Sequence, residues 1–287
     1  MPCQWRKEEH SDSKSFPEQA SLHHQVTTLP SCRHTTEPFQ IGGSICGLMH
    51  GIMFKRLGHN VHILEQANSA RAGHAAGMAG RDDVLEYMKI YDLVEQPWYI
   101  DSPKTQFLNK EGDVTRTLGK ALCMTSWTVL YHQLRANFDG YGGVFVKKIP
   151  EKLETDGDVI LDEGKKVVDL LDLGEHVEVR FQDVTNSREH TILADLVIGA
   201  DGSNSFMRQK MLPEVKSNWA GYVAFRGCVP QADVSVETLK VLIEKVTVFK
   251  SSSSKSYILL WVPYLITYDL MLINRLVTIS HVTKMAV

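Results

Sequence analysis

The sequence predicts an α/β protein, with a parallel sheet and crossover helices followed by a smaller, incomplete mixed α+β part. Two observations indicate this class. The stretch Phe39–Glu65 reads as strand, glycine turn, helix and strand, which is a β-α-β unit. The apolar run Leu196–Ile198 is too short for a helix, and small residues follow it, as they often follow buried parallel strands.

The composition is that of an ordinary globular protein. The 287 residues allow about two domains, and 43% apolar and 23% charged residues are usual fractions. The net charge of −3 gives no reason to expect nucleic acid or an anionic membrane as the main partner. The most apolar stretch, 258–273, contains Pro263 and Asp269 and falls short of the roughly 20 residues of a membrane span, so no membrane association is expected.

The five cysteines are scattered and odd in number, and none forms a C-x-x-C pair, so neither a disulfide framework nor a zinc site is expected. We therefore expect a reducing, cytoplasmic location. Residues 1–38 mix polar residues and prolines without an apolar period, and we interpret them as disordered. For His23, His24 and His34 in this segment we expect solvated side chains and no metal site.

The stretch after Phe39 has the layout of a dinucleotide-binding unit. Apolar residues at helical spacing run from Ile45 to Leu57, Gly58 ends the helix, and the apolar strand Val61–Glu65 follows. Dinucleotide sites need a glycine turn at the helix start, where the pyrophosphate approaches the backbone. They also need an acid about 20 residues on, which binds ribose hydroxyls.

Two features depart from the usual G-x-G-x-x-G pattern. Ser44 stands where the second glycine is expected, between Gly42 and Gly47. The strand before the turn is interrupted by the Thr-Glu-Pro segment 36–38. A weak or missing first strand is therefore expected.

A second small-residue loop covers Arg71–Met78. Its glycines permit close approach to a flat ligand, and Arg71 can pair with a phosphate; a flexible loop is the alternative. A capped helix over 82–93 and irregular strands over 96–125, with a hairpin tip at 109–113, are expected next. The apolar residues expected on the buried face of this helix are Val84, Leu85, Met88 and Ile90.

A further helix is expected to run to about Phe138, capped by the segment Thr125–Trp127 and ended by the Asp-Gly pair 139–140. Arg135 adjoins its buried face, where a guanidinium reaches a phosphate or forms a surface ion pair, and the sequence does not decide between the two. The residues expected on that face are Trp127, Leu130, Tyr131 and Leu134. Strands are expected over 144–149, 165–173, 176–182 and 191–193.

The segment after Leu196–Ile198 is the third candidate site. Asp201 and Gly202 form a small-residue turn, and Asn204 or Ser205 starts a helix whose free N–H groups would face the same gap. Arg208 lies three residues after Ser205, so the two share a helix face. A strand, such a turn and a helix start hold phosphate-bearing ligands in α/β sheets, whereas a capped surface turn is the alternative.

The character of the chain changes after Pro213. An aromatic, β-prone stretch covers 219–229, a short helix is expected over 235–245, and strands over 246–250 and 257–262. The tail 270–287 shows no clear helix or strand boundary. We expect a disordered segment over 1–38, a cofactor-binding domain over 39–213, and part of a substrate-binding domain with an unmatched tail over 214–287.

These residues together resemble the single-component FAD-dependent aromatic hydroxylases, oxidoreductases of the flavoprotein monooxygenase class. The nearest subgroup is related to 2,6-dihydroxypyridine 3-monooxygenase, and serine is usual there at the Ser44 position. The segments that carry the resemblance are Gly42–Leu48, Arg71–Met78, Met124–Trp127 with Leu134–Gly140, Asp195–Arg208 and Tyr222–Gly227.

The resemblance implies a Rossmann-like FAD-binding domain and a role for each matched position. The glycine turn with Ser44 holds the pyrophosphate, Glu65 the adenosine ribose, Arg71 and Arg135 lie near phosphates, and the Asp-Gly turn serves FAD and NAD(P)H. The cofactor-binding residues implied are Gly42, Gly43, Ser44, Gly47, Glu65, Gln66, Arg71, Gly77, Met78, Arg135, Asp201, Gly202, Ser205 and Arg208.

The implied reaction reduces FAD with NAD(P)H, captures O₂ as a flavin hydroperoxide and hydroxylates a small aromatic or heteroaromatic ring. Tyr222, Arg226 and Tyr257 are available as substrate-side groups, but no catalytic residue is assigned. The sequence leaves a homodimer open.

The family's late Gly-Asp motif has no counterpart in this sequence, and family members are longer. A truncated, catalytically inactive family fragment is therefore an alternative. An NAD(P)-binding dehydrogenase is a second, although the Asp201 turn and the Arg71 loop argue against it. A non-catalytic interaction protein is the third.

Overall fold

The structure is a computed structural model. It describes residues 37–68, 77–102, 104–109, 113–119, 122–219, 222–230, 233, 235–237, 246–250, 256–261 and 276–284. The chain divides into two compact units, 1–34 and 35–287, and the described residues belong to the second. Predictions for residues 1–36, for the loop from Arg71 to Ala76 and for a helix over 238–245 lie outside the described residues. No helix within the described ranges has the length and apolar character needed to cross a membrane.

One part of the fold is built on a four-stranded parallel sheet, in the order β12-β1-β2-β8. The expectation of a weak or missing first strand is wrong, because all four residues of β1 are buried between two neighbours. Pro38 is tolerated as the first residue of this strand, where its missing N–H costs little. The strands are β1 (Pro38–Ile41), β2 (Val61–Glu65), β8 (Val159–Glu163) and β12 (Leu196–Gly199).

Strand β12 is parallel, as predicted, but it is not fully buried. Leu196 is 42% exposed, since β12 pairs only with β1 among the described strands and lies at the edge of this sheet. An apolar run alone does not distinguish a central strand from an edge strand.

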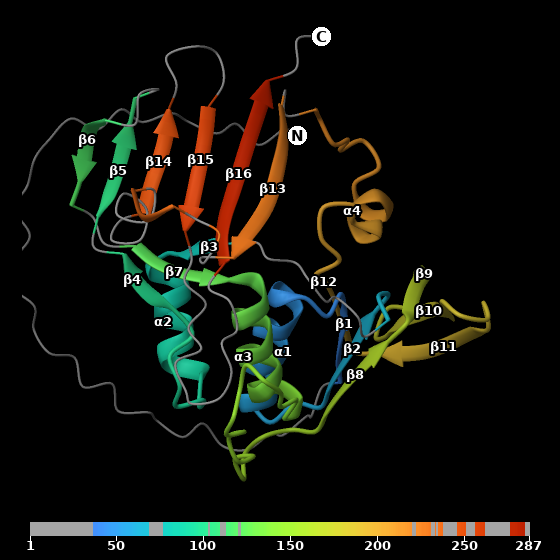
Figure 1. Cartoon of the computed structure of the whole chain (residues 1–287). Coiled ribbons are helices and arrows are strands. Elements are labelled where there is room, and N and C mark those ends of the chain that lie inside the picture. Colours follow the sequence, from blue (N-terminus) through green and yellow to red (C-terminus); the bar gives the residue numbers. More distant parts are fainter. Residues whose placement is uncertain are drawn as a thin grey trace, which may run out of the picture. The chain divides into compact units, whose positions relative to one another are not determined.

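Helices α1 (Ile45–Arg56) and α3 (Trp127–Asp139) lie side by side against this sheet (Figure 1). Their approach is close because a Cβ on Gly51 of α1 would stand 2.8 Å from the ring of Phe138. Both predicted helix ends are confirmed, since Gly58 and Gly140 adopt positive φ angles of 86° and 72° directly after the last turns. The best-buried apolar side chains of this core are Leu48, Ile52, Ile63, Leu134 and Phe138.

Helix α2 (Asp82–Tyr91) packs on the same core with a face that differs from the predicted one. Met88 is buried as expected, but Ile90 is 61% exposed because it lies two residues further round the helix. Tyr87 takes its place and donates its hydroxyl to the carbonyl of Met49 at 2.7 Å. The expectation of a capped helix is wrong at its start, since no side chain caps α2 at Arg81.

Two further sheets are a small antiparallel sheet and a three-stranded meander (Figure 1). In the meander, Val179 and Phe181 are buried, which confirms the predicted alternation. The expected strand over 144–149 is wrong: the segment is a turn with one bridge, Gly143 to Val146. The small sheet contains β3 (Gly77–Gly80), β7 (Leu122–Ser126) and β4 (Ile100–Ser102); the meander contains β9 (Lys165–Asp172), β10 (Val177–Asp183) and β11 (Glu189–Ala194).

A six-stranded sheet has the order β13-β16-β15-β14-β5-β6 (Figure 1). Strands β5 and β6 form the predicted hairpin, and β5 pairs in parallel with the distant β14. The expectation of no clear element in the tail is corrected by β16, which pairs with both β13 and β15. The strands are β5 (Thr105–Leu108), β6 (Val114–Leu118), β13 (Tyr222–Pro230), β14 (Val246–Lys250), β15 (Ser256–Trp261) and β16 (Leu276–Lys284).

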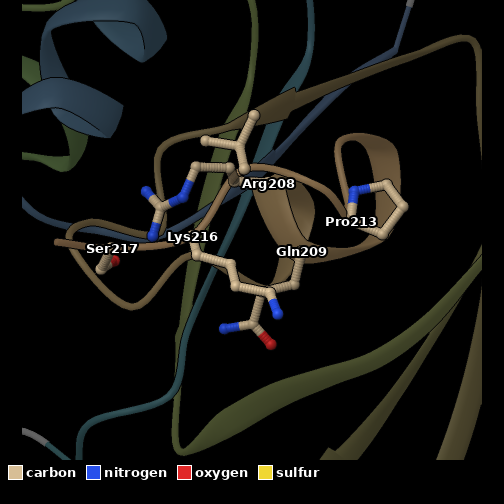
Figure 2. A pocket seen from close by; sticks show the side chains of 6 residues that line it. Arg208, Gln209, Pro213, Lys216 and Ser217 are labelled. Atoms are coloured by element: carbon tan, nitrogen blue, oxygen red, sulfur yellow. The ribbon is translucent and has the colours of Figure 1, made fainter.

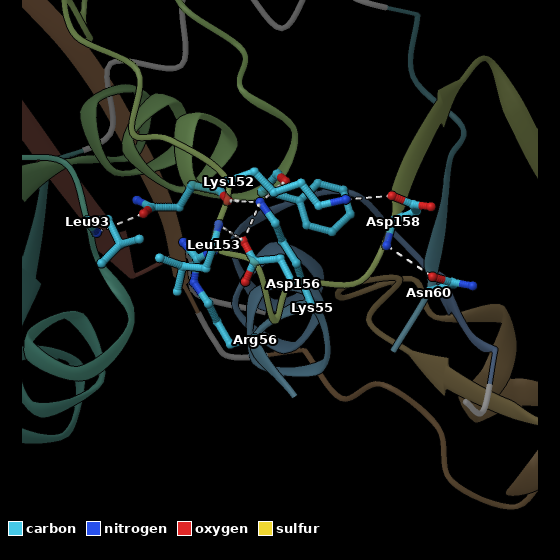
Figure 3. Close-up of polar contacts among 10 residues, drawn as sticks. Lys55, Arg56, Asn60, Leu93, Lys152, Leu153, Asp156 and Asp158 are labelled. Carbon is cyan, nitrogen blue, oxygen red and sulfur yellow. Dashed lines mark hydrogen bonds and ion pairs between the residues drawn. The ribbon is translucent and has the colours of Figure 1, made fainter. Parts of the chain in front are cut away.

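Buried ion pairs join the carboxyl end of α1 to the loop before β8, and hydrogen bonds from Lys55 join it to the end of α3 (Figure 3). Asp156, whose side chain is fully buried, pairs with Arg56 and lies 3.6 Å from Nζ of Lys55. Lys55 also donates to the carbonyls of Asn137 and Phe138, each at 2.8 Å. Burial, followed by the charge of Arg56, lowers the pKa of Lys55, while Asp156 acts in the opposite direction. This cluster fixes the two helix ends in place.

Candidate functional site

The candidate site lies at the carboxyl ends of the parallel strands. Because β12, β1 and β2 are adjacent and parallel, the turns that follow them meet at one edge of the sheet. A cavity of about 440 Å³ opens there, and it brings together the glycine turn, the end of β2 and the Asp201 turn. Its lining residues are Ile41, Gly42, Ser44, Leu64, Glu65, Gln66, Lys165, Lys166, Val167, Ala200, Asp201, Gly202, Asn204, Phe206 and Gln209.

The glycine turn is packed so tightly that side chains would not fit in it. Gly42 has a φ of 106°, and a Cβ there would stand 2.3 Å from the carbonyl oxygen of Ala200. A Cβ on Gly47 would stand 1.9 Å from the carbonyl oxygen of Gly42. The amide of Gly42 also donates to the carbonyl of Leu64 at 2.8 Å. The turn is therefore built into the sheet edge, with its backbone exposed to the cavity.

Glu65 ends β2 and holds the turn from the other side. Its side chain is 5% exposed, and both carboxylate oxygens accept from backbone amides at 2.8 Å, one from Gly43 and one from Ala67. A carboxylate oxygen has more than one acceptor direction, so this anchoring is compatible with a further bond to a ligand hydroxyl. Glu65 thus has a structural task that the sequence did not reveal.

The start of α1 faces this cavity through Ser44. The Ser44 side chain forms no capping hydrogen bond, and the first turn of α1 contains no acidic residue. An uncapped helix start has a partial positive charge and outward-pointing N–H groups, which suits a phosphate.

The Asp201 turn leads into the short helix α4 (Phe206–Met211). Asp201 accepts from the amide of Met207 at 3.0 Å, and Ser205 accepts from the amide of Arg208 at 2.9 Å. The predicted serine cap is confirmed, but the expectation of free N–H groups facing the gap is wrong for these two amides. Asp201 and Gly202 still line the cavity, whereas Ser205 is a buried cap.

Arg208 lines a second cavity of about 380 Å³ together with Lys216 and Ser217 (Figure 2). Its guanidinium donates to the carbonyl of Ser203 at 2.5 Å. The structure therefore separates Arg208 from the cavity that contains Asp201. Gln209 lines both cavities, so the two adjoin.

Arg135 is buried, and carboxylates surround it. Its guanidinium contacts Asp139 at 2.8 Å and Glu163 at 3.3 Å, and it donates to the hydroxyl of Tyr131 at 2.7 Å. Burial opposes the charged form, but the hydrogen bond and charge of Asp139 outweigh it, so the pKa of Arg135 lies above its ordinary value. The sequence left open whether Arg135 reaches a phosphate or forms an ion pair, and in this structure it forms ion pairs.

The remaining predicted site residues lie elsewhere. Gly77 and Met78 belong to β3 and pair with β7, and neither lines the 440 Å³ cavity. Arg71 lies outside the described residues. Sequence reasoning missed Lys165 and Lys166, which line the cavity from the start of β9. The only local signal was a pair of lysines after a glycine.

Three kinds of comparison agree on what this chain is similar to. The protein family described as FAD binding domain matches residues 104–248, slightly more than half of the chain. The 2,6-dihydroxypyridine 3-monooxygenase of Paenarthrobacter nicotinovorans is 26% identical over 211 residues, which are 72% of this chain and 46% of that protein. The 6-hydroxynicotinate 3-monooxygenase of Pseudomonas fluorescens is 34% identical over 210 residues, 69% of this chain and 49% of that protein. The chain thus spans about half the length of these curated relatives.

Solved structures show the same fold. The 2,6-dihydroxypyridine-3-hydroxylase from Arthrobacter nicotinovorans superposes with a TM-score of 0.69 at 21% identity, covering 88% of this chain and 57% of that one. Klebsiella pneumoniae HpxO, complexed with FAD and uric acid, gives 0.62 at 18% identity, with coverages of 88% and 57%.

Proposed function

Because the chain belongs to the FAD-binding-domain family, we propose that it is part of an NAD(P)H-consuming monooxygenase that hydroxylates a small aromatic or heteroaromatic ring. The observation that supports this most strongly is the single cavity that contains the glycine turn, Glu65 and Asp201. A glycine turn at an uncapped helix start, with a carboxylate at the end of the next strand, fits a dinucleotide such as FAD.

The residues that line the cavity have contacts and chemistry that suit FAD. Gly42 lines the cavity without a side chain, so the backbone of the turn can approach a pyrophosphate closely. Glu65 and Gln66 would bind the adenosine ribose, and Asp201 with Gly202 the inner half of the cofactor. The roles of Arg71 near a phosphate and of Gly77 and Met78 near the flavin ring remain predictions. Lys165 and Lys166 also line this cavity; Lys165 forms an ion pair with Asp183, so Lys166 is the one that adds positive charge there.

Bound FAD would supply the redox chemistry, accepting reducing equivalents from NAD(P)H and activating O₂ for hydroxyl transfer, as the sequence resemblance implies. The chain's own residues bind and orient the cofactor, and the apolar lining from Ile41, Leu64 and Phe206 excludes water on one side of it. No residue is assigned to proton transfer.

We further propose that the second cavity takes part of the pyridine nucleotide. Arg208 and Lys216 contribute two positive charges there, and the cavity adjoins the first at Gln209 (Figure 2). Phosphate groups of NAD(P)H are the ligands that this chemistry favours. Arg208→Ala should then raise KM for NAD(P)H while FAD affinity stays close to that of the wild type.

The names of the two curated relatives guide the choice of substrate. Both act on hydroxylated pyridines by name, so hydroxypyridines are the first compounds to test. A cytoplasmic location and a homodimer are also part of the proposal. Residues 39–213 and 214–287 stay our proposed cofactor-binding and substrate-binding domains, although β5 and β14 join the two ranges in one sheet.

The experiment is to purify the protein, record its visible spectrum, and measure FAD released on denaturation. NAD(P)H oxidation is then followed with and without hydroxypyridines. Bound FAD with substrate-stimulated NAD(P)H oxidation and a hydroxylated product is the expected result. A folded, colourless protein that ignores added FAD would refute the proposal. FAD binding without NAD(P)H oxidation would support the alternative of a catalytically inactive family member.

A further inference from the structure

Three serines occupy the N-cap positions of described helices, and one of them behaves differently. Ser126 and Ser205 each accept a hydrogen bond from the amide three residues on, at 3.2 and 2.9 Å. Ser44 stands at the same position of α1, but its side chain caps no amide of that helix. Its Oγ instead accepts from the indole Nε1 of Trp127 at 3.3 Å.

Trp127 is held in place by a row of side chains four residues apart on α3. Its ring stacks on Tyr131, with centroids 4.6 Å apart and planes inclined by 14°. The Tyr131 hydroxyl accepts from Arg135 at 2.7 Å, and Arg135 is buried in ion pairs with Asp139 and Glu163. Burial raises the pKa of Tyr131, so this hydroxyl stays protonated. The indole N–H therefore has a defined direction.

This contact decides what the Ser44 hydroxyl does. A serine hydroxyl has one O–H donor and two acceptor directions. When the indole occupies an acceptor direction and draws Oγ away from the helix, the first amides of α1 stay uncapped and the O–H is left to donate. Ser44 lines the 440 Å³ cavity, so an anion there meets both the free amides and the hydroxyl donor.

We propose that Trp127 is a positioning residue for the cofactor site. Its indole N–H turns Ser44 from a helix cap into a hydrogen-bond donor aimed at a phosphate of the bound dinucleotide. This inference rests on the proposed function. It also gives a physical reason for a serine at the second glycine position, because glycine has no side-chain acceptor for this bond.

The first test is a double-mutant cycle of Trp127→Phe and Ser44→Ala, read by equilibrium titration with FAD and with ADP. Phenylalanine keeps an aromatic ring on Tyr131 but removes the N–H donor. Trp127→Phe should weaken binding about three- to tenfold when Ser44 is present, which is the effect of roughly one hydrogen bond. The same change in the Ser44→Ala background should have almost no effect.

The second test uses the protein without cofactor and measures thermal unfolding. In the wild type, Ser44→Ala removes the bond to the indole but no helix cap, so it should lower the unfolding midpoint less than loss of a true cap does. Ser126→Ala, the matched control at a true cap, should lower the midpoint by several degrees. In the Trp127→Phe background, Ser44 is free to cap α1, so Ser44→Ala should then lower the midpoint by about as much as Ser126→Ala does.

Failure of this inference and failure of the proposed function give different results. A wild type that binds neither FAD nor ADP refutes the proposed function and the phosphate role of Ser44 together. A wild type that binds FAD, with Trp127→Phe binding it equally well or losing affinity equally in both Ser44 backgrounds, overturns the inference alone. If Trp127→Phe does not fold, Ser44→Ala decides: weaker binding of both FAD and ADP, with a smaller loss of midpoint than in Ser126→Ala, supports the inference, and unchanged binding overturns it.

Discussion

Replacement of Glu65 tests the fold of the glycine turn and the proposed cofactor site together. The carboxylate is almost fully buried and accepts from the amides of Gly43 and Ala67, both at 2.8 Å. Glu65→Ala removes both acceptors and leaves two backbone amides without their carboxylate. Glu65→Gln keeps one acceptor oxygen but turns an NH₂ group toward the other amide.

The expected loss of stability follows from these two bonds. A hydrogen bond to a charged group contributes about 1.5–3 kcal/mol. The site opens into the cavity, so water partly replaces the lost acceptor and reduces the cost. We expect Glu65→Ala to lower the free energy of unfolding by about 2–4 kcal/mol, and Glu65→Gln by about 1–3 kcal/mol because one acceptor remains.

The assay is urea denaturation of the cofactor-free protein, followed by circular dichroism. Glu95→Ala is the control, since Glu95 forms only a surface ion pair with Lys148 and its loss should cost less than about 1 kcal/mol. A separate titration should show FAD affinity reduced by about 1–3 kcal/mol in Glu65→Ala, through lost ribose bonds.

Two results would refute this reasoning. An unfolding free energy of Glu65→Ala equal to that of Glu95→Ala would mean that the carboxylate does not hold the turn. Unchanged FAD affinity would remove Glu65 from the cofactor site even if the stability loss is found.

Three further predictions concern stability and reactivity. Asp156→Ala leaves two buried cations without their carboxylate and should lower the free energy of unfolding by about 3–5 kcal/mol, measured by denaturant titration. Gly47→Ala should cost about 1–3 kcal/mol because its Cβ would stand 1.9 Å from a backbone oxygen, whereas Gly119→Ala, with nothing within 4 Å, should be near neutral in the same titration. Burial raises the pKa of the Cys123 thiol to about 11, whereas Cys46 is exposed. At pH 8 iodoacetamide should therefore label Cys46 first, and Cys123 should react only as the pH approaches 11. Equal labelling of the two cysteines at pH 8 in peptide mass maps would contradict this.

The local elements of the fold could be predicted because their causes are local. Glycines at positive φ end α1 and α3, serines cap α3 and α4, and the alternation in β10 matches one buried face. Each of these depends on residues within one turn or one strand, where sequence order and spatial neighbourhood coincide.

Contacts between residues far apart in the chain could not be predicted from the sequence. Ile90 was expected on the buried face of α2 but is exposed, and Tyr87 packs on the core instead, because the position of the core relative to α2 decides which face is buried. The pairing of β5 with β14 and the existence of β16 depend on partners far along the chain. Hydrophobic pattern alone does not select such partners.

For the candidate site, the sequence by itself determined the residue types: a glycine turn at a helix start, an acid at the end of β2, and an Asp-Gly turn after β12. Only the tertiary structure decided their use. In the tertiary structure these three segments line one cavity, together with two lysines that the sequence did not indicate. Arg208 lines a second cavity, and Arg135 is buried in ion pairs. Trp127 donates a hydrogen bond to Ser44. The physical reason is that parallel strand order gathers distant turns at one edge, while hydrogen-bond partners are chosen by geometry that no local pattern records.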